Sequence, residues 1–206
     1  DYGIGNLWSV KNVFEYLGAE VVITSDPDII SSSKCIILPG VGNFGTGMKN
    51  LNSLNLVNSL NEAVIKKGAS FLGICLGMQM AVIEYARNVK KIRYANSTEI
   101  SEKCKDPVID LMTSQKEIIN KGGTMRLGAW DCEIEKNTKS YKSYKKKLIS
   151  ERHRHRYEFN NSYSDKIFDD KFIVAGSNPD TKLVEIVENI DHPWFVGVQF
   201  HPEYKS

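Results

Sequence analysis

The sequence predicts a single α/β domain with a central, mainly parallel sheet flanked by helices. Strand-like and helix-like segments alternate over the first half of the chain, and short strand-like segments separated by polar loops fill the second half. The first-half strand over 35–38 is short and apolar throughout, and the strand over 70–74 is apolar after Ser70, as expected of strands that helices cover on both faces. The 206 residues suffice for one core, so we expect one domain over residues 1–206.

Periodicity and turn residues place the individual elements. In the first half we expect helices over 7–17, 51–67 and 76–89, and strands over 19–24, 35–38 and 70–74. In the second half we expect strands over 125–130, 148–159, 172–177, 183–188 and 195–200. The β-α-β-α order of the first half favours a parallel sheet, because parallel neighbours need a crossover connection.

Bulk composition argues against several function classes. No apolar run is long enough to span a bilayer, and the formal net charge of +2 gives no indication of nucleic-acid binding. The basic run over 136–147 is expected to be a solvated, mobile loop. The four cysteines form no CxxC pair, which predicts no metal site and favours a reducing, cytoplasmic setting. Because the chain opens at Asp1 without a methionine, we expect it to be part of a longer one.

The most specific local pattern is Gly73-Ile74-Cys75-Leu76-Gly77, where an apolar strand runs directly into a helix. This is the G-x-nucleophile-x-G elbow with cysteine as the nucleophile. A helix N-terminus favours a thiolate, and the N–H of Leu76 can hold an oxyanion. Taken alone, Cys75 is equally well explained as a buried structural cysteine, which is a common fate of cysteine in an apolar strand.

Two residues near the end of the chain complete a candidate catalytic set. His201 and Glu203 follow the apolar run over 195–198, with Pro202 between them. Residues two apart in extended chain share a face, so Glu203 can orient the imidazole of His201, which acts as the general base. Together with Cys75 they form a nucleophile, base and orienting group in that order.

A glycine-rich loop follows the strand over 35–38. Gly40, Gly42 and Gly45 match G-x-G-x-x-G, but Pro39 opens the loop and no acidic residue follows at the distance that a dinucleotide site needs. We interpret the loop as lying beside the elbow, where the backbone N–H of Val41 supplies a second oxyanion donor.

These patterns resemble a known family. Three segments are similar to the motifs of the class I (triad) glutamine amidotransferases: 39–42 (PGVG), 73–79 (GICLGMQ) and 199–203 (QFHPE). The likeness covers essentially the whole chain. The resemblance implies that fold and a Cys-His-Glu triad made of the three residues named above.

Two members of the family resemble different parts of the chain. Residues 71–206 resemble the glutaminase domain of CTP synthase, most specifically at 122–128 (GGTMRLG) and 151–160 (ERHRHRYEFN). Residues 1–51 resemble the glutaminase subunit of imidazole glycerol phosphate synthase. Val41 stands where CTP synthases usually have a second glycine.

The resemblance also implies a substrate site. It places Gly40, Gln79, Glu99 and Arg156 at the glutamine-binding positions of the family. A carboxylate suits the substrate ammonium, and a guanidinium suits its oxygens. If residues 152–157 form a strand, their three arginines share one face that must meet acids, a ligand or water. The two histidines on the other face suggest no metal site, because no third ligand is apparent.

The function implied by the resemblance is hydrolysis of L-glutamine to glutamate and ammonia, with the ammonia passed to a synthase domain or subunit. The first expectation is CTP synthesis from UTP, in which ATP, Mg²⁺ and GTP belong to the partner domain and none to this chain. The alternatives are the glutaminase subunit of imidazole glycerol phosphate synthase in histidine biosynthesis, a non-catalytic regulatory module, and a cysteine hydrolase of another amide. The triad argues against the regulatory module, and Glu99 and Arg156 favour free glutamine.

Overall fold

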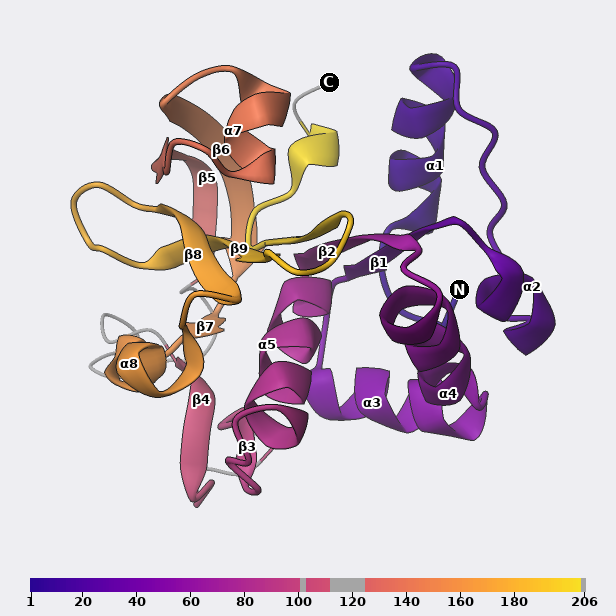
Figure 1. Ribbon diagram of the computed structural model, residues 1–206, viewed down its shortest axis with the longest axis horizontal. Helices are drawn as coiled ribbons and strands as arrows, with labels where there is room; N and C mark the ends of the chain where they lie inside the picture. Colours follow the sequence, from indigo (N-terminus) through magenta and orange to yellow (C-terminus); the bar gives the residue numbers. More distant parts are fainter. Residues whose placement is uncertain (101–102, 112–124, 205–206) are drawn as a thin grey trace.

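The computed structural model describes residues 1–100, 103–111 and 125–204 (Figure 1). A seven-stranded sheet has the order β1 (Cys35–Gly40), β2 (Ser70–Cys75), β10 (Phe195–Val198), β9 (Val184–Asn189), β8 (Phe172–Ser177), β5 (Arg126–Ile134) and β6 (Leu148–His155). A second, three-stranded sheet has the order β3 (Ala95–Ser97), β4 (Asp106–Leu111) and β7 (Tyr157–Phe159).

Helices connect and cover these strands. The α-helices are α1 (Leu7–Tyr16), α2 (Pro27–Ser32), α3 (Phe44–Ser53), α4 (Leu56–Leu60), α5 (Leu76–Asn88), α7 (Lys139–Tyr144) and α8 (Ser164–Ile167). A π-helical turn, η1 (Asn61–Lys66), continues α4, and two 3₁₀ turns are η2 (Asn161–Tyr163) and η3 (Pro202–Tyr204). No helix in the part of the chain that the structure describes has the length and apolar character needed to cross a membrane.

The α/β class is confirmed, but the sheet is mixed and not mainly parallel. In the seven-stranded sheet β1, β2 and β10 are parallel neighbours, whereas the pairs from β10 to β6 are antiparallel. The reason lies in the connections: residues 178–183 and 190–194, which join β8 to β9 and β9 to β10, are too short to hold a crossover helix. The carboxyl ends of β1, β2 and β10 therefore meet at one edge, and this arrangement places the candidate site.

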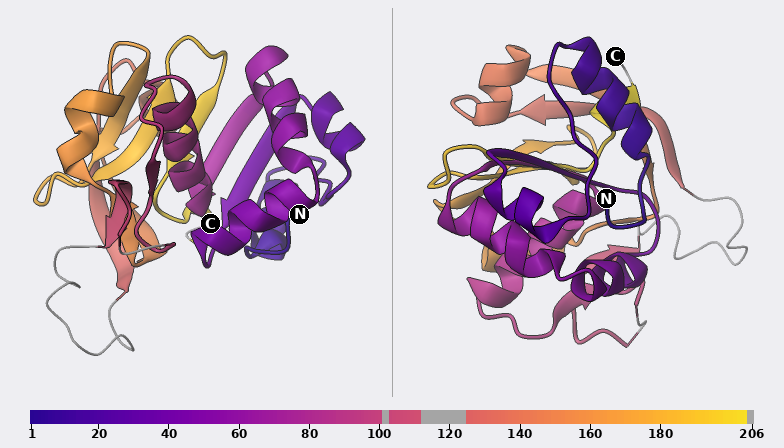
Figure 2. Two further views of the ribbon diagram at one scale, coloured as in Figure 1. Left: turned by 90° about the horizontal axis from the view of Figure 1, so that it is seen from below. Right: turned by 90° about the vertical axis from the view of Figure 1, so that its right-hand side faces the viewer.

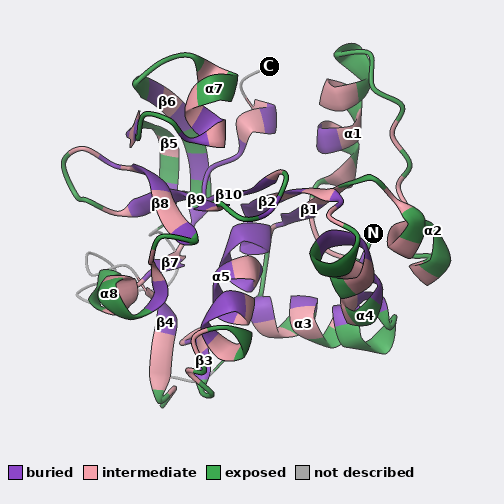
Figure 3. Cartoon of the chain, viewed as in Figure 1, coloured by how far each residue is buried: buried purple, intermediate pink, exposed green. Residues whose placement is uncertain are grey.

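The sheet separates two apolar cores (Figures 1 and 2). Helices α3, α4 and α5 lie on one side of β1 and β2, and α1 lies on the other. The first core joins residues such as Phe44, Leu51 and Ile83 to the sheet, and the second joins Val10 to Ile74 and to the inner side of β5. All four residues of β10 and most residues of α5 are buried (Figure 3). The elements on either side of the candidate site are thus part of the buried interior.

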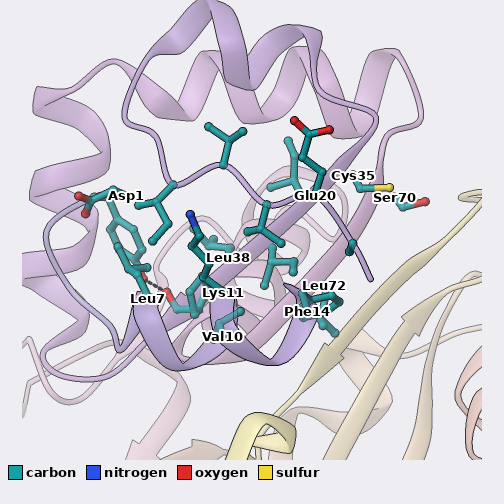
Figure 4. Close-up of a pocket in the computed structure, with 18 of the residues that line it drawn as sticks. Asp1, Leu7, Val10, Lys11, Phe14, Glu20, Cys35, Leu38, Ser70 and Leu72 are labelled. Atoms are coloured by element: carbon teal, nitrogen blue, oxygen red, sulfur yellow. Dashed lines mark hydrogen bonds between the residues drawn. The ribbon is translucent and has the colours of Figure 1, made fainter. Parts of the chain in front are cut away.

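Residues 19–24, expected to form a strand, have no strand structure. Residues 19–23 line, together with β1, a largely apolar cavity of about 550 Å³ beneath α1 (Figure 4). A strand needs a hydrogen-bonding neighbour about 4.8 Å away, and in the described part of the chain no strand pairs with this segment. None of Cys75, His201 and Glu203 lines this cavity.

Other boundaries differ for identifiable reasons. The helix expected over 51–67 begins earlier, at Phe44, where the side chain of Asn43 caps it, and it is interrupted at Asn55, whose backbone is left-handed (φ 56°). The run over 136–147, expected to be a mobile loop, contains α7. Strands β3 and β4 were not predicted, and residues 122–124 of the motif 122–128 lie outside the described residues.

Candidate active site

Cys75 stands at a strained turn between β2 and α5. Its backbone has φ 54° and ψ −104°, a conformation that costs a non-glycine residue energy and is typical of nucleophile elbows. The flanking glycines are required by close contacts: a Cβ on Gly73 would lie 2.8 Å from the carbonyl carbon of Gly77, and one on Gly77 would overlap the carbonyl oxygen of Leu38. The expected elbow is therefore present, with the thiol carrier held at the end of a buried strand.

The glycine loop lies beside the elbow, as expected. Gly40 pairs with Cys75 in the parallel register of β1 and β2, and a Cβ on Gly40 would lie 2.8 Å from Cβ of Leu76. Val41 follows directly in the loop. Leu76 is the first residue of α5, where backbone N–H groups have no partner within the helix. The two expected oxyanion donors thus come from adjacent chain segments.

His201 and Glu203 lie together after β10. The imidazole Nδ1 is 2.8 Å from Oε1 of Glu203, and both side chains are almost completely buried. The pairing does not depend on extended chain as expected, because Pro202–Tyr204 forms a 3₁₀ turn. The His201 backbone N–H donates to the carbonyl of Arg152 at 2.8 Å, and the ring stacks on Tyr204 with centroids 4.7 Å apart. The contact with Tyr204 was not predicted from the sequence.

The protonation of His201 is set by its neighbours. Burial alone would lower its pKa, but interactions with the Cys75 side chain and with the Glu203 carboxylate outweigh burial and raise the pKa to about 9. The Nε2 atom is buried and makes no hydrogen bond of standard geometry within the described residues. Such loose contacts are common in sites without substrate. His201 therefore carries a proton at neutral pH.

Glu99 and Arg156 approach the same region from other elements. The Oε2 atom of Glu99 accepts a 2.8 Å hydrogen bond from the N–H of Phe44, the first residue of α3. Burial raises the pKa of Glu99, while the Phe44 hydrogen bond and the charge of Arg156 act in the opposite direction. Arg156 occupies the bend between β6 and β7, and its Nε is buried without a hydrogen-bond partner among the described residues. A carboxylate and a guanidinium are therefore brought near each other.

Gln79 uses its amide nitrogen within the protein. Its Nε2 donates to the carbonyl of Tyr157 at 2.8 Å and to Oε1 of Gln199 at 3.2 Å. Gln79 thus connects α5 to the residue that follows Arg156. The predicted contact with substrate would have to use its carbonyl oxygen.

The expected alternation holds over 152–155, within β6, but not at Arg156, which lies in the bend after the strand. Arg152 and Arg154 are exposed to solvent, while His153 and His155 are buried and interact through Nδ1 and Nε2, respectively, at 2.9 Å. Burial, reinforced by the charge of a nearby arginine, lowers the pKa of His153 to about 2 and of His155 to about 3, so both rings are neutral. Within residues 1–100, 103–111 and 125–204, no three His, Cys, Asp or Glu side chains are arranged to hold a metal ion.

Comparison with known proteins defines the class first. The chain belongs to the class-I glutamine amidotransferase family, whose family model matches residues 1–206. Within that family it is similar to CTP synthases. It is 60% identical over 206 residues to the CTP synthase of Clostridium acetobutylicum, covering 99% of this chain and 37% of that protein. It is 61% identical over 136 residues to the CTP synthase of Christiangramia forsetii, covering 66% of this chain and 25% of that protein.

A solved structure agrees with this relationship. The fold is similar to the glutaminase domain of Trypanosoma brucei CTPS with bound acivicin, with a TM-score of 0.78 and 30% identity over 97% of this chain and 81% of that one. Since the similarity to the Clostridium enzyme covers 99% of this chain, it includes the first 51 residues. The alternative of an imidazole glycerol phosphate synthase subunit is therefore not favoured. The chain spans about a third of the length of that curated relative.

Proposed function

We propose that this chain is the glutaminase domain of a CTP synthase, which hydrolyses L-glutamine and supplies ammonia to a synthase domain. One observation carries the proposal: adjacent parallel strands bring the strained Cys75 at the end of β2 and the His201–Glu203 pair after β10 to the same edge of the sheet. This arrangement supports a nucleophile with a proton-transfer partner and an orienting carboxylate.

In the proposed mechanism, the Cys75 thiolate attacks the side-chain amide carbon of glutamine. His201, which carries a proton at neutral pH, gives it to the departing ammonia as the carbon–nitrogen bond breaks. Glu203 holds the ring and stabilises its charged form. Water, activated by the now neutral His201, then hydrolyses the glutamyl thioester and releases glutamate.

The oxyanion formed during both steps needs hydrogen-bond donors that are already in place. The backbone N–H groups of Val41 and Leu76 are our candidates, because the β1–β2 register sets their segments side by side. Val41 adjoins Gly42, whose φ of 119° suits glycine, so the loop can adopt turns that are closed to other residues.

Recognition of free glutamine is assigned to residues around this edge. We assign the substrate ammonium to Glu99, whose carboxylate is already oriented by the Phe44 N–H. We assign the substrate carboxylate to Arg156, whose Nε has no hydrogen-bond partner among the residues that the structure describes. Gly40 lets the backbone approach the elbow closely, and Gln79 braces the Tyr157 carbonyl beside Arg156.

The destination of the ammonia follows from the relatives. CTP synthases that are 60% and 61% identical to this chain are longer than it, which supports a synthase domain as partner. In this proposal ATP, Mg²⁺ and GTP act on that domain, with UTP as the acceptor. The proposal is tested by mixing the chain with the synthase domain of a CTP synthase and measuring glutamate release and CTP formation from glutamine. The same mixture is made with the synthase subunit of imidazole glycerol phosphate synthase. If only that subunit stimulated glutamate release, the proposal would be refuted.

A further inference from the structure

A second buried glutamine contacts the candidate nucleophile. Gln199 follows β10, is 0% exposed to solvent, and directs its Nε2 to Sγ of Cys75 at 3.6 Å. Its Oε1 lies 3.2 Å from Nε2 of Gln79, which also donates to the carbonyl of Tyr157 at 2.8 Å. These contacts form one chain of hydrogen bonds from a backbone carbonyl to the sulfur.

The chain of contacts fixes which end of the Gln199 amide faces the sulfur. Amide nitrogen and oxygen are assigned from their partners. The Tyr157 carbonyl can only accept, so the Gln79 atom facing it must be the nitrogen. That nitrogen also donates to Gln199, so the Gln199 atom beside it must be the oxygen. The remaining end of the Gln199 amide, which meets Cys75, is therefore a donor.

We propose that Gln199 is a further catalytic residue, whose amide N–H donates to Sγ of Cys75 and stabilises its thiolate, in an orientation that Gln79 enforces. A neutral thiol is a weak acceptor, whereas a thiolate accepts strongly. An amide donor buried against sulfur is thus better satisfied when the sulfur is charged. The role in glutamine turnover rests on the proposed function, but the contact and its effect on the thiolate do not.

This donor adds to the other groups that act on the same sulfur. His201 interacts with Cys75 from the segment after β10. Burial raises the pKa of Tyr2 and of Tyr204, and the Cys75 charge adds to this effect for both hydroxyls, after Glu203 in the case of Tyr204. Among these groups, His201 changes its charge during turnover, whereas the Gln199 amide does not. Gln199 therefore provides a donor that remains in place while His201 passes its proton on.

The test is the rate at which iodoacetamide alkylates Cys75, followed by mass spectrometry of its peptide, in Gln199→Met and in the unchanged protein. Met has a similar shape but no donor. Measured across pH, the rate should fall as the thiol takes up its proton. We expect this fall to begin about one pH unit higher in Gln199→Met, so that alkylation slows about tenfold on the acid side, the equivalent of one hydrogen bond to a charged group. On the alkaline plateau the rate should be nearly unchanged. The exposed Cys35 serves as an internal control, because its rate should not respond.

Gln79→Met tests separately whether Gln79 sets the orientation of the Gln199 amide. Without Gln79 the Gln199 amide can turn its oxygen to the sulfur, so the fall in the alkylation rate should also move to higher pH, and the double variant should show no larger shift than Gln199→Met alone. Additive shifts, an unchanged pH profile in either variant, or an equal loss of rate at every pH would overturn the proposal. If Gln199→Met does not fold, the alkylation of Cys75 in Gln79→Met alone tests the proposal. Because iodoacetamide is not glutamine, absence of glutaminase activity would refute the proposed function and leave this result intact.

Discussion

The Nδ1 atom of His201 lies 2.8 Å from Oε1 of Glu203, in a site where both side chains are shielded from water. Glu203→Gln keeps a hydrogen-bond acceptor but removes the charge that stabilises the imidazolium. We expect kcat for glutamine hydrolysis to fall by about 10²–10⁴-fold, with a smaller change in KM. Steady-state glutamate release checks this, with Glu203→Asp as a control that keeps the charge. A kcat within a few-fold of the original in Glu203→Gln would contradict the role of the carboxylate.

The pH dependence of His201 follows from its raised pKa. Its ordinary value is 6.5 and its value here is about 9, so the ring stays protonated across the neutral range and loses its proton as the pH rises through about 9. Because the folded-state pKa is raised, the contribution of this group to stability is fully present below about pH 6.5 and is lost as the pH rises through about 9. We expect glutamine hydrolysis to decline over the same alkaline range.

An NMR titration of the His201 ring measures this pKa directly. Cys75→Ala removes one of the two neighbours that raise it, so the midpoint should move down toward 6.5 in that variant. A midpoint at or below 6.5 in the unchanged protein would show that Cys75 and Glu203 do not outweigh the effect of burial on the ring.

The close contact at Gly77 leads us to predict that a larger residue there destabilises the fold. A Cβ at this position would overlap the carbonyl oxygen of Leu38, so Gly77→Ala must force α5 away from β1. We expect a loss of about 1–3 kcal/mol, or failure to fold, with the melting temperature falling by about 2–4 °C per kcal/mol. Gly45→Ala is the control, because the nearest atom to its Cβ is the end of the Asn43 side chain, and its melting temperature should change little. Equal melting temperatures for the two variants would show that the elbow is not tightly packed.

Substrate recognition is tested at Arg156 and Glu99. Arg156→Lys keeps the charge but loses the planar fork, and Glu99→Gln keeps an acceptor for the Phe44 N–H but loses the charge. Each should raise KM for glutamine by about 10-fold or more, with less effect on kcat. Arg152→Lys, in the same strand-like motif but exposed to solvent, should leave KM unchanged. An equal rise in KM in all three variants would point to a general loss of structure.

The sequence predicted well those features that depend on neighbouring residues. The elbow at Cys75 was predictable because its glycines and flanking apolar strand are contiguous, and the strands over 172–177 and 195–198 were predictable from composition. The relative directions of the strands were not predictable, since they depend on how short loops such as 190–194 direct the chain. Residues 19–24 have a strand-like composition but pair with no strand in the described part of the chain, and composition alone does not reveal a missing neighbour.

In the candidate site, too, the contacts between residues close in sequence were predictable and those between distant residues were not. His201 and Glu203 were expected together from their spacing, although a 3₁₀ turn and not extended chain brings them into contact. The contact of Gln199 with Cys75 joins residues 124 positions apart, and a glutamine in an apolar context carries no signal of that contact. Only the register of β2 and β10 brings the two together.

The most direct measurement concerns Cys75 itself. CTP formation is measured for Cys75→Ala and for the unchanged chain. Each is combined with the synthase domain of a CTP synthase, UTP and ATP. Glutamine and ammonium chloride are compared as nitrogen sources. We predict that Cys75→Ala abolishes glutamine-dependent glutamate release and CTP formation, leaves ammonium-dependent CTP formation unchanged, and keeps its fold. Glutamine turnover by a folded Cys75→Ala chain at the rate of the unchanged protein would contradict the assignment of Cys75 as the nucleophile.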